Sequence, residues 1–353
     1  MVPHVVIPHK VHQLCPIRYD LCLYVWDSKH LIIVYVDDLL VVGMKERIAC
    51  KKKEVAGIFE MRDLGEVHWF LAMEITCDQI AQMITIDQWQ YIWKILEHFR
   101  LENAQSVSTP MAANIKLPKL EVLEVDQHLY QSMLGSLMYT VIGTHPNIMF
   151  AVHHLSQFLA TPGSEHLVAM KRVYWYVSGT RNLRITYHGN QIGDELIGFT
   201  DSDWAGNSNS RRSVSGYAFI FCGAVVTWLA KKQPMIALSS TEAEYMVVTH
   251  AGKEAVFLEH LYGDAGIPIA VPIFLLVDNQ SAIALAENPI FHMHSKHIEV
   301  QHHWVHEKIE DGLIKLEYVP TVDQVADIFM KLLNSEKFRK FHGVLGLVPV
   351  ESH

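Results

Sequence analysis

Short hydrophobic runs, separated by acidic residues, glycine and proline, divide the first part of the chain into strands and helices. The runs at 31–35 and 39–43 flank Asp37 and Asp38, which predicts a β-hairpin with an acidic turn. Further elements are expected at 46–60 (helix), 68–76 (strand) and 90–99 (helix). We assign residues 1–104 to this first block.

The next block, residues 105–190, changes to helical spacing. Apolar positions predict helices at 128–143, 147–160 and 164–178, and Gly143, Pro146, Pro162 and Gly179 mark their ends. This block is therefore predicted to be mostly α-helical.

A third block, residues 191–335, begins with strands and then alternates helices with strands. The strands are expected at 195–201, 216–222, 225–231, 272–278 and 313–319, and the helices at 240–262, 280–287, 296–311 and 323–334. Such an order predicts an α/β fold of the α+β kind, with a mixed five-stranded sheet covered by helices. Residues 336–353 are assigned as a C-terminal tail.

Composition narrows the class of protein. A length of 353 residues predicts two or three domains, and a hydrophobic content of 50% argues against general disorder. Five scattered cysteines fit neither a disulfide framework nor a zinc site, so a reducing compartment is expected.

No run approaches the ~18–20 apolar residues of a membrane span. The net charge of -9 counts against strong nucleic-acid binding. The N-terminus indicates a chain begun part-way through a longer reading frame.

Carboxylates at strand ends and helix starts are the candidate chemistry of the third block. Asp201 lies at the end of a strand, Asp278 closes the apolar run IFLLVD, and Glu242, Glu244 and Asp327 lie in the first turns of helices. Each has a structural alternative, because acids favour helix N-termini and Ser239-x-x-Glu242 matches a capping box.

Gathered together, these carboxylates would suit divalent cations. Carboxylates beside apolar strands need compensation, and several of them can hold two Mg²⁺ ions for phosphodiester hydrolysis. Without metal, such close carboxylates would raise one another's pKa.

Six segments of the third block resemble the successive signatures of copia-type ribonuclease H. They occur in order: GFTDSDWAGN, RRSVSGYAFIF, TWLAKKQPMIALSSTEAEY, LLVDNQSAIALAENP, KHIEV and LEYVPTVDQVADI. The segments MRDLGEVHWFLAMEI, VSTP, YQSMLGSLMYT and AVHHLSQF are similar to upstream parts of copia-type retrotransposon Pol polyproteins. The resemblance covers about Leu23 to Leu333. It implies the end of a reverse transcriptase palm, a helical thumb or connection region, and a ribonuclease H-like domain.

The resemblance also implies site residues. The catalytic and metal-binding Asp–Glu–Asp–Asp set of the family would fall on Asp201, Glu244, Asp278 and Asp327. Glu242 and Glu244 point to roughly opposite helix faces, so spacing alone does not choose between them, and the resemblance favours Glu244. Asp203 is a neighbour of Asp201 that would assist.

Basic residues and histidines near these motifs have more than one interpretation. Arg211, Arg212, Lys231 and Lys232 would contact phosphates or be ordinary solvated charges. A zinc site is the less favoured interpretation of the histidine-rich helix, whose members are His292, His294, His297, His302, His303 and His306.

The YVDD segment at 35–38 resembles the polymerase motif of reverse transcriptases. A two-residue acidic turn is also an ordinary hairpin. The polymerase needs a further aspartate from an earlier palm strand, so Asp37 and Asp38 cannot complete its metal site alone. The chain is therefore predicted to lack polymerase activity.

Several positions depart from the family pattern. Arginine is usual at the positions of His145, Trp175, His294 and Gln301, and aspartate is usual at those of Asn147 and Asn207. Met330 and Leu332 replace the usual threonine and proline. All are reachable by C-to-T changes on one DNA strand or the other, which predicts a copy decaying by cytosine deamination. Codons outside that set would refute this hypothesis.

The expected function is metal-dependent cleavage of RNA in RNA/DNA hybrids by a ribonuclease H-type endonuclease. The cofactor would be two Mg²⁺ ions, with Mn²⁺ as an alternative. The partners would be the hybrid and the rest of the Pol polyprotein, with no membrane. The expected location is the cytoplasm, in a virus-like particle of the parent element, with the nucleus as an alternative. Two other hypotheses remain: a non-catalytic relic that binds nucleic acid weakly, and an unrelated metal-dependent phosphatase or nuclease.

Overall fold

The computed structural model describes residues 15–27, 30–112, 115, 117–189, 195–204, 212–287 and 296–349. The chain divides into two compact units. The first unit comprises residues 1–67 and 253–271, and the second comprises 68–252 and 272–353. This division follows spatial contacts rather than sequence modules, so the boundaries predicted after residues 104 and 190 stay predictions.

The first unit contains an antiparallel sheet in the order β1-β2-β3-β4. Its elements are β1 (Cys15–Pro16), β2 (Leu23–Asp27), β3 (His30–Tyr35), β4 (Asp38–Val42) and helix α1 (Lys45–Ala56). Alternate residues of β3 are buried, as period-2 strands require. One hydrophobic cluster of this unit is formed by Tyr24, Ile32, Val34 and Val55.

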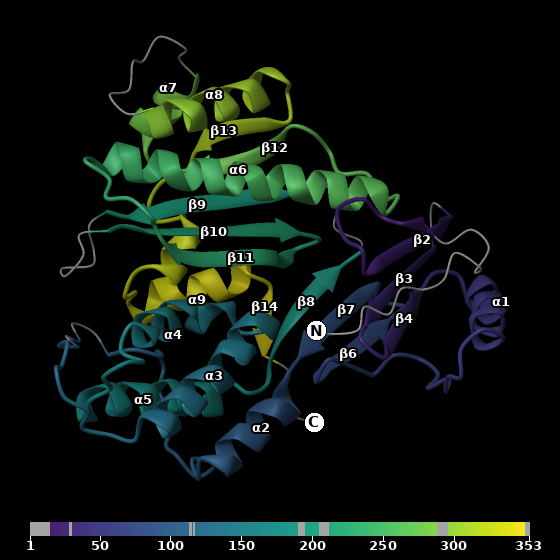
Figure 1. Ribbon diagram of the computed structural model, residues 1–353, viewed down its shortest axis with the longest axis horizontal. Helices are drawn as coiled ribbons and strands as arrows, with labels where there is room; N and C mark the ends of the chain where they lie inside the picture. The colour runs from purple at the N-terminus through teal and green to yellow at the C-terminus, as the bar shows by residue number, and fades with distance from the viewer. Residues whose placement is uncertain are drawn as a thin grey trace. The chain divides into compact units, whose positions relative to one another are not determined.

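In the second unit, a five-stranded sheet with the order β11-β10-β9-β12-β13 carries the candidate site (Figure 1). Its strands are β9 (Ile197–Asp203), β10 (Val214–Phe221), β11 (Ala224–Lys232), β12 (Ile273–Val277) and β13 (Ile314–Tyr318). The first three strands pair antiparallel, whereas β12 pairs parallel with both β9 and β13. The predicted mixed five-stranded sheet is confirmed.

Helices accompany this sheet. They are α6 (Ser240–Asp264), α7 (Gln280–Glu287), α8 (Lys296–Glu310), the short 3-10 helix η2 (Val325–Phe329) and α9 (Ser335–Val344). Residues of α6 up to Gly252 belong to the second unit, and those from Lys253 belong to the first. A Cβ at Gly252 would meet the Trp304 ring at 3.1 Å, so glycine allows α8 to pack close to α6.

A second, antiparallel sheet with the order β14-β8-β7-β6-β5 lies in the same unit. Its strands are β5 (Trp69–Phe70), β6 (Met73–Asp78), β7 (Met83–Asp87), β8 (Leu183–His188) and β14 (Leu347–Pro349). The sequence predicted one strand at 68–76, but the structure forms the hairpin β5–β6 there. Strands β7, β8 and β14 were not predicted.

The predicted helices of the second block are confirmed. They are preceded by α2 (Trp89–His98), and they are α3 (Gln127–Gly143), η1 (Pro146–Ile148), α4 (Met149–Ser156) and α5 (Ser164–Gly179). Asp126 caps α3 by accepting from the His128 and Leu129 N–H groups. Their buried faces join one continuous core with residues of the two sheets.

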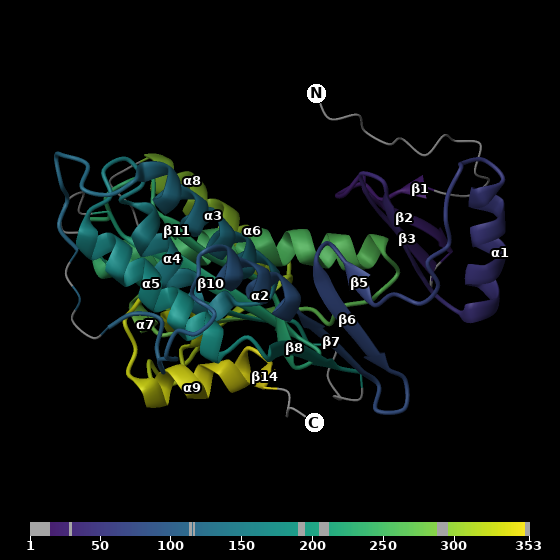
Figure 2. The same ribbon diagram turned by 90° about the horizontal axis from the view of Figure 1, so that it is seen from below.

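Residues after 323 differ most from the prediction. The helix expected at 323–334 is instead η2, a 3-10 turn, and the expected tail contains α9 and β14, which lie side by side (Figure 2). Phe341, Leu345 and Leu347 of this segment are buried in the core. The segment is part of the folded unit because its apolar side chains fill space that local periodicity does not reveal. Among the described residues, no helix is long and apolar enough to cross a bilayer.

Candidate metal centre

Asp201 and Asp278 lie side by side because two adjacent strands run parallel. Thr200 of β9 is opposite Val277 of β12, and each of these residues is followed by one of the aspartates. Parallel strands about 4.8 Å apart present their carboxyl ends at the same edge of the sheet, where ligands bind in α/β folds. The sheet topology therefore creates a two-carboxylate edge.

The start of α6 supplies the third carboxylate, which comes from Glu244 and not from Glu242. The Ser239 hydroxyl accepts from the Glu242 N–H at 3.1 Å, and the Glu242 carboxylate accepts from the Leu238 N–H at 2.7 Å. The Glu244 carboxylate instead accepts from the Ser202 N–H at 3.1 Å and the Ser202 hydroxyl at 3.0 Å. Glu242 is thus used in the cap, and Glu244 faces β9.

Buried Gln233 fixes this helix against the sheet. Its side-chain amide donates to the Ser215 hydroxyl at 3.0 Å and to the Ala243 carbonyl at 2.9 Å. Since Ser215 is on β10 and Ala243 precedes Glu244, this one side chain sets the height of the helix start above the strands. Sequence analysis did not identify Gln233, because a polar residue gives no local signal of its burial.

Asp201, Glu244 and Asp278 form a group whose ligand oxygens all lie within 4.8 Å of one another. Asp201 is 1% exposed and Glu244 is 4% exposed. Asp278 accepts from the Thr321 hydroxyl at 2.9 Å. Among the described residues, the buried Oε2 atom of Glu244 has no hydrogen-bond partner. Hard oxygen ligands with an unpartnered oxygen fit a divalent cation such as Mg²⁺.

Burial and mutual repulsion raise the pKa values of two of these carboxylates. A bound cation would counter both effects. Burial, with repulsion from Asp278, raises the pKa of Glu244 to about 7. Burial, Asp327 and Glu244 raise the pKa of Asp201 well above its usual value. Both shifts are typical of crowded carboxylates at functional sites.

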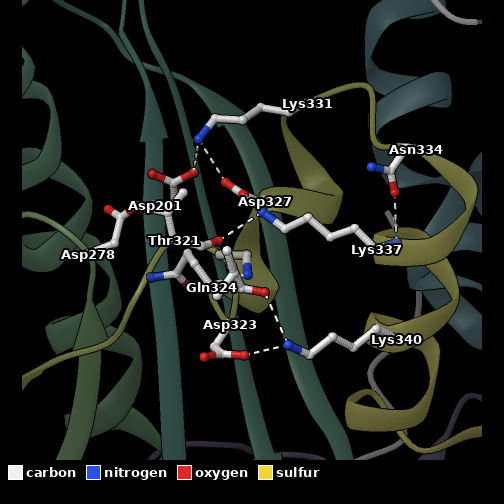
Figure 3. A network of polar contacts seen from close by, with 12 residues as sticks. Asp201, Asp278, Thr321, Asp323, Gln324, Asp327, Lys331, Asn334, Lys337 and Lys340 are labelled. Atoms are coloured by element: carbon white, nitrogen blue, oxygen red, sulfur yellow. Dashed lines mark hydrogen bonds and ion pairs between the residues drawn. The ribbon is translucent and has the colours of Figure 1, made fainter.

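Asp327 lies beside this group but outside it, held by lysines (Figure 3). Lys331 Nζ lies 2.7 Å from Asp201 Oδ2 and 2.7 Å from Asp327 Oδ1, so it bridges the two carboxylates. Lys337 of α9 pairs with Asp327 Oδ2. Burial alone would raise the pKa of Asp327, but hydrogen bonds with Asp201, Lys331 and Lys337 lower it below its usual value.

The turn η2 is positioned by two long-range contacts. The Gln324 amide donates to the Thr200 carbonyl at 2.8 Å and to the Leu276 carbonyl at 3.1 Å, which links the turn to β9 and β12. A Cβ at Gly216, opposite Asp201 on β10, would meet the Met330 sulfur at 3.0 Å. The missing side chain thus lets Met330 pack on the sheet. Gln324, Lys331 and Lys337 are site residues that sequence analysis missed.

The other candidates of the third block lie around this edge. Asp203, at the end of β9, is half-buried and outside the group. Lys231 is opposite Ser215, which is opposite Ser202, so it lies two strands from the carboxylates, roughly 10 Å away. Burial lowers the pKa of Lys232, and Arg212 and Lys119 lower it further, so Lys119 joins the predicted basic group. Arg211 lies outside the described residues.

In the first unit, Asp37 and Asp38 lie at the hairpin between β3 and β4. Tyr35 is opposite Asp38, so Val36 and Asp37 form the turn, and Val36 has a φ of 53°. A β-branched residue in the left-handed region indicates local strain. Among the described residues, no third metal-ligating group gathers with the pair.

Two of the predicted histidines have described side chains. His306 of α8 lies 3.3 Å from the Ala286 carbonyl through Nδ1 and 3.3 Å from the Glu310 carboxylate through Nε2. His303 is exposed on the same helix. The other predicted members lie outside the described side chains: His292, His294, His297 and His302.

A family model for reverse transcriptase (RNA-dependent DNA polymerase) matches residues 8–113. The chain is 35% identical over 325 residues to the retrovirus-related Pol polyprotein from transposon TNT 1-94 of Nicotiana tabacum, covering 90% of this chain and 24% of that polyprotein. It thus spans about a quarter of that relative's length.

A shorter relative is covered more fully. The putative transposon Ty5-1 protein of Saccharomyces cerevisiae is 33% identical over 236 residues, covering 65% of this chain and 74% of that protein. A solved structure of the foamy viral protease-reverse transcriptase in complex with RNA/DNA hybrid is similar to 86% of this chain and 37% of its own, with 14% identity and a TM-score of 0.48. The sequence relatives decide the assignment: the chain belongs to the copia-type retrotransposon Pol family.

Proposed function

We propose that the second unit hydrolyses the RNA strand of RNA/DNA hybrids in the presence of a divalent metal ion. The observation that supports this most is the group Asp201–Glu244–Asp278, whose oxygens lie within 4.8 Å of one another at the carboxyl edge of two parallel strands. An unpartnered, buried Glu244 Oε2 within the group is a ligand prepared for a cation.

In this proposal, Asp201, Glu244 and Asp278 would hold Mg²⁺, with two ions expected and Mn²⁺ as a substitute, and the metal would supply activation of a water and charge stabilisation at the leaving oxygen. The protein supplies orientation. Ser202 fixes Glu244 through two hydrogen bonds, and Thr321 fixes Asp278 through one. Asp327 is the fourth carboxylate, and the turn η2 holds it next to Asp201.

Substrate contacts are assigned to the basic residues along the same end of the sheet. Lys231 and Lys232 close strand β11, and Arg212 and Lys119 lie near Lys232. These groups would contact phosphates, which position a duplex without reading its sequence. Choice of a hybrid would then rest on its shape and on the ribose 2′-OH. The polyprotein of the parent element is the proposed setting of this activity.

No primer extension is proposed for this chain. Asp37 and Asp38 are the polymerase-like carboxylates of the first unit, and the described residues gather no third ligand with them. A two-metal polymerase site needs carboxylates from more than one strand. Incorporation of nucleotides by the purified chain on a primed RNA template would contradict this.

The test of hydrolysis uses a labelled RNA/DNA hybrid in Mg²⁺. Asp278→Asn is expected to reduce cleavage by at least about 100-fold, because it removes one charged ligand of the metal group. Glu242→Gln is the matched control, since Glu242 lies on the same helix as Glu244 but serves in the cap. Its cleavage rate should stay within a few-fold of the wild type.

The alternative function is a non-catalytic relic that binds nucleic acid weakly. It predicts no cleavage in Mg²⁺ or Mn²⁺ by a chain whose folding is shown by cooperative unfolding. Cleavage that persists unchanged in Asp278→Asn would instead contradict the site assignment.

A further inference from the structure

Lys331 has an unusual place in the candidate metal centre. Its ammonium nitrogen lies 2.7 Å from carboxylate oxygens of both Asp201 and Asp327 (Figure 3). The side chains of these two acids are each only 2% exposed, whereas that of Lys331 is 36% exposed. The lysine therefore reaches from the surface into the space between two buried carboxylates.

Both carboxylate oxygens of Asp327 already contact an ammonium group in this arrangement. Lys331 pairs with its Oδ1 and Lys337 with its Oδ2. The group Asp201–Glu244–Asp278 differs, because it retains the unpartnered Oε2 of Glu244. The four carboxylates therefore form two environments, one open to a metal ion and one filled by ammonium groups.

The charges of the two lysines limit how many metal ions the four carboxylates can attract. When a bound metal ion keeps all four carboxylates ionised, they carry four negative charges, and the two lysines neutralise two of them. One divalent cation at the open group then brings this cluster to neutrality. A second cation would meet no net attraction, unless a lysine leaves.

We propose that Lys331 is a tethered cation that occupies the second cation position, between Asp201 and Asp327, and that a second metal ion binds there only by displacing it. Lys331 is thus a positioning residue rather than a catalytic one. In the metal-free protein it keeps two buried carboxylates paired, which limits the cost of assembling the site. The inference deepens the proposed function, since it concerns the same carboxylates.

Direct metal binding tests this proposal without any nucleic acid. Isothermal titration with Mg²⁺, and with Mn²⁺ as a second probe, is compared for the wild type, Lys331→Met and Lys331→Arg. Lys331→Met should bind the second ion at least tenfold more tightly than the wild type, because no ammonium competes. Lys331→Arg retains the charge and should bind it about as weakly as the wild type.

Lys340→Met is the matched control. Lys340 pairs with Asp323 at the surface, in the same network but away from the metal group. Its titration should match that of the wild type. Thermal unfolding adds a second readout, since Lys331→Met should melt at a lower temperature without metal and gain more from Mg²⁺ than the wild type. Identical isotherms for Lys331→Met and the wild type would overturn the proposal.

A measurement on the wild type keeps the test decisive if Lys331→Met does not fold. Acylation by an N-hydroxysuccinimide ester, followed by peptide mass spectrometry, reports how accessible each lysine amine is. Modification of Lys331 should increase at least several-fold in saturating Mg²⁺, whereas that of Lys340 should not change. Continued protection of Lys331 in saturating Mg²⁺ would overturn the displacement.

These readouts separate the inference from the proposed function. A metal response that depends on Lys331 in a protein that cuts no hybrid would support the tethered cation and contradict hydrolysis. Cleavage of hybrids together with a Lys331-independent isotherm would support hydrolysis and contradict the tethered cation.

Discussion

Single residues decide which carboxylates meet. Glu242 and Glu244 are two positions apart at the start of one helix, and their sequence context is nearly the same. Glu242 closes a cap with Ser239 and Leu238, whereas Glu244 hydrogen-bonds with Ser202 across the sheet. The difference arises from the rotation of α6 about its axis, which is set by packing against the strands and not by the helix itself.

A buried polar centre lies between the helices and α9. His145 and Asn147, at positions where the family resemblance leads us to expect arginine and aspartate, are both buried in it. The Asn147 amide donates to the Tyr176 hydroxyl at 2.6 Å and lies 3.1 Å from His342 Nε2. The centre is thus built from neutral groups. Met330 packs on Gly216, while Asn207 and His294 lie outside the described residues.

This centre predicts a loss of stability in acid. Burial lowers the pKa of His145 to about 4 and, with repulsion from His145, that of His342 to about 4, from an ordinary 6.5. The unfolded chain therefore takes up protons between pH 6.5 and 4 that the folded chain does not, and folding stability falls as the pH falls through this window. For His342 the loss is about 3 kcal/mol.

Urea unfolding at pH 7.5 and at pH 4.5 measures this effect. His342→Gln removes one titrating group, so its free energy of unfolding should fall less between the two pH values than that of the wild type. Other buried histidines and carboxylates contribute to both proteins, and the comparison cancels them. An equal fall in both proteins would contradict the prediction.

At the scale of elements, strands and helices with strong periodicity were predicted well. The sequence indicated β12 and α6 within two residues of their observed ends, and α7 matched its predicted bounds. The turn η2 was predicted as a helix because its apolar residues have helical spacing. Its actual shape depends on Gln324, which donates to carbonyls of two strands. Helix α9 was overlooked, although Asn334 caps it by accepting from the Lys337 N–H.

Helix α9 should stabilise the fold through its buried face. Phe341 is 0% exposed and belongs to the main core, so Phe341→Ala should lower the free energy of unfolding by about 3–5 kcal/mol. Arg339 is an exposed residue of the same helix, and Arg339→Ala should change stability by only about 0.5 kcal/mol. Chemical denaturation followed by circular dichroism distinguishes the two. Equal stability of Phe341→Ala and Arg339→Ala would show that α9 is a dispensable tail.

At the scale of the whole molecule, the acidic balance limits how nucleic acid can bind. The net charge is -9, yet Lys119, Arg212, Lys231 and Lys232 belong to the same folded unit as the carboxylates. Local charge near the site, and not the overall charge, would then govern contact with a duplex. The carboxylates themselves repel phosphate unless cations offset them.

The salt dependence of hybrid binding measures how much these basic residues contribute to it. Binding of a hybrid in Ca²⁺ is expected to weaken as salt rises, and Lys231→Ala should reduce the slope of log K against log salt by about one. Lys315 pairs with Glu317 on β13, so Lys315→Ala is a control of equal charge change. Equal slopes for Lys231→Ala and the wild type would remove Lys231 from the interface.

The sequence by itself determined the elements with clear periodicity, the mixed sheet, the family, and which acidic residues end strands or begin helices. These features depend on neighbours in the chain, so a local pattern carries them. The resemblance already favoured Glu244 over Glu242, but only the tertiary structure showed that Ser202 holds Glu244 in the group while the cap uses Glu242, and that Lys331 bridges Asp201 and Asp327. The bonds from Gln324 to Thr200 and from Lys331 to Asp201 join residues 124 and 130 positions apart. Such contacts depend on register and packing, which no local pattern specifies.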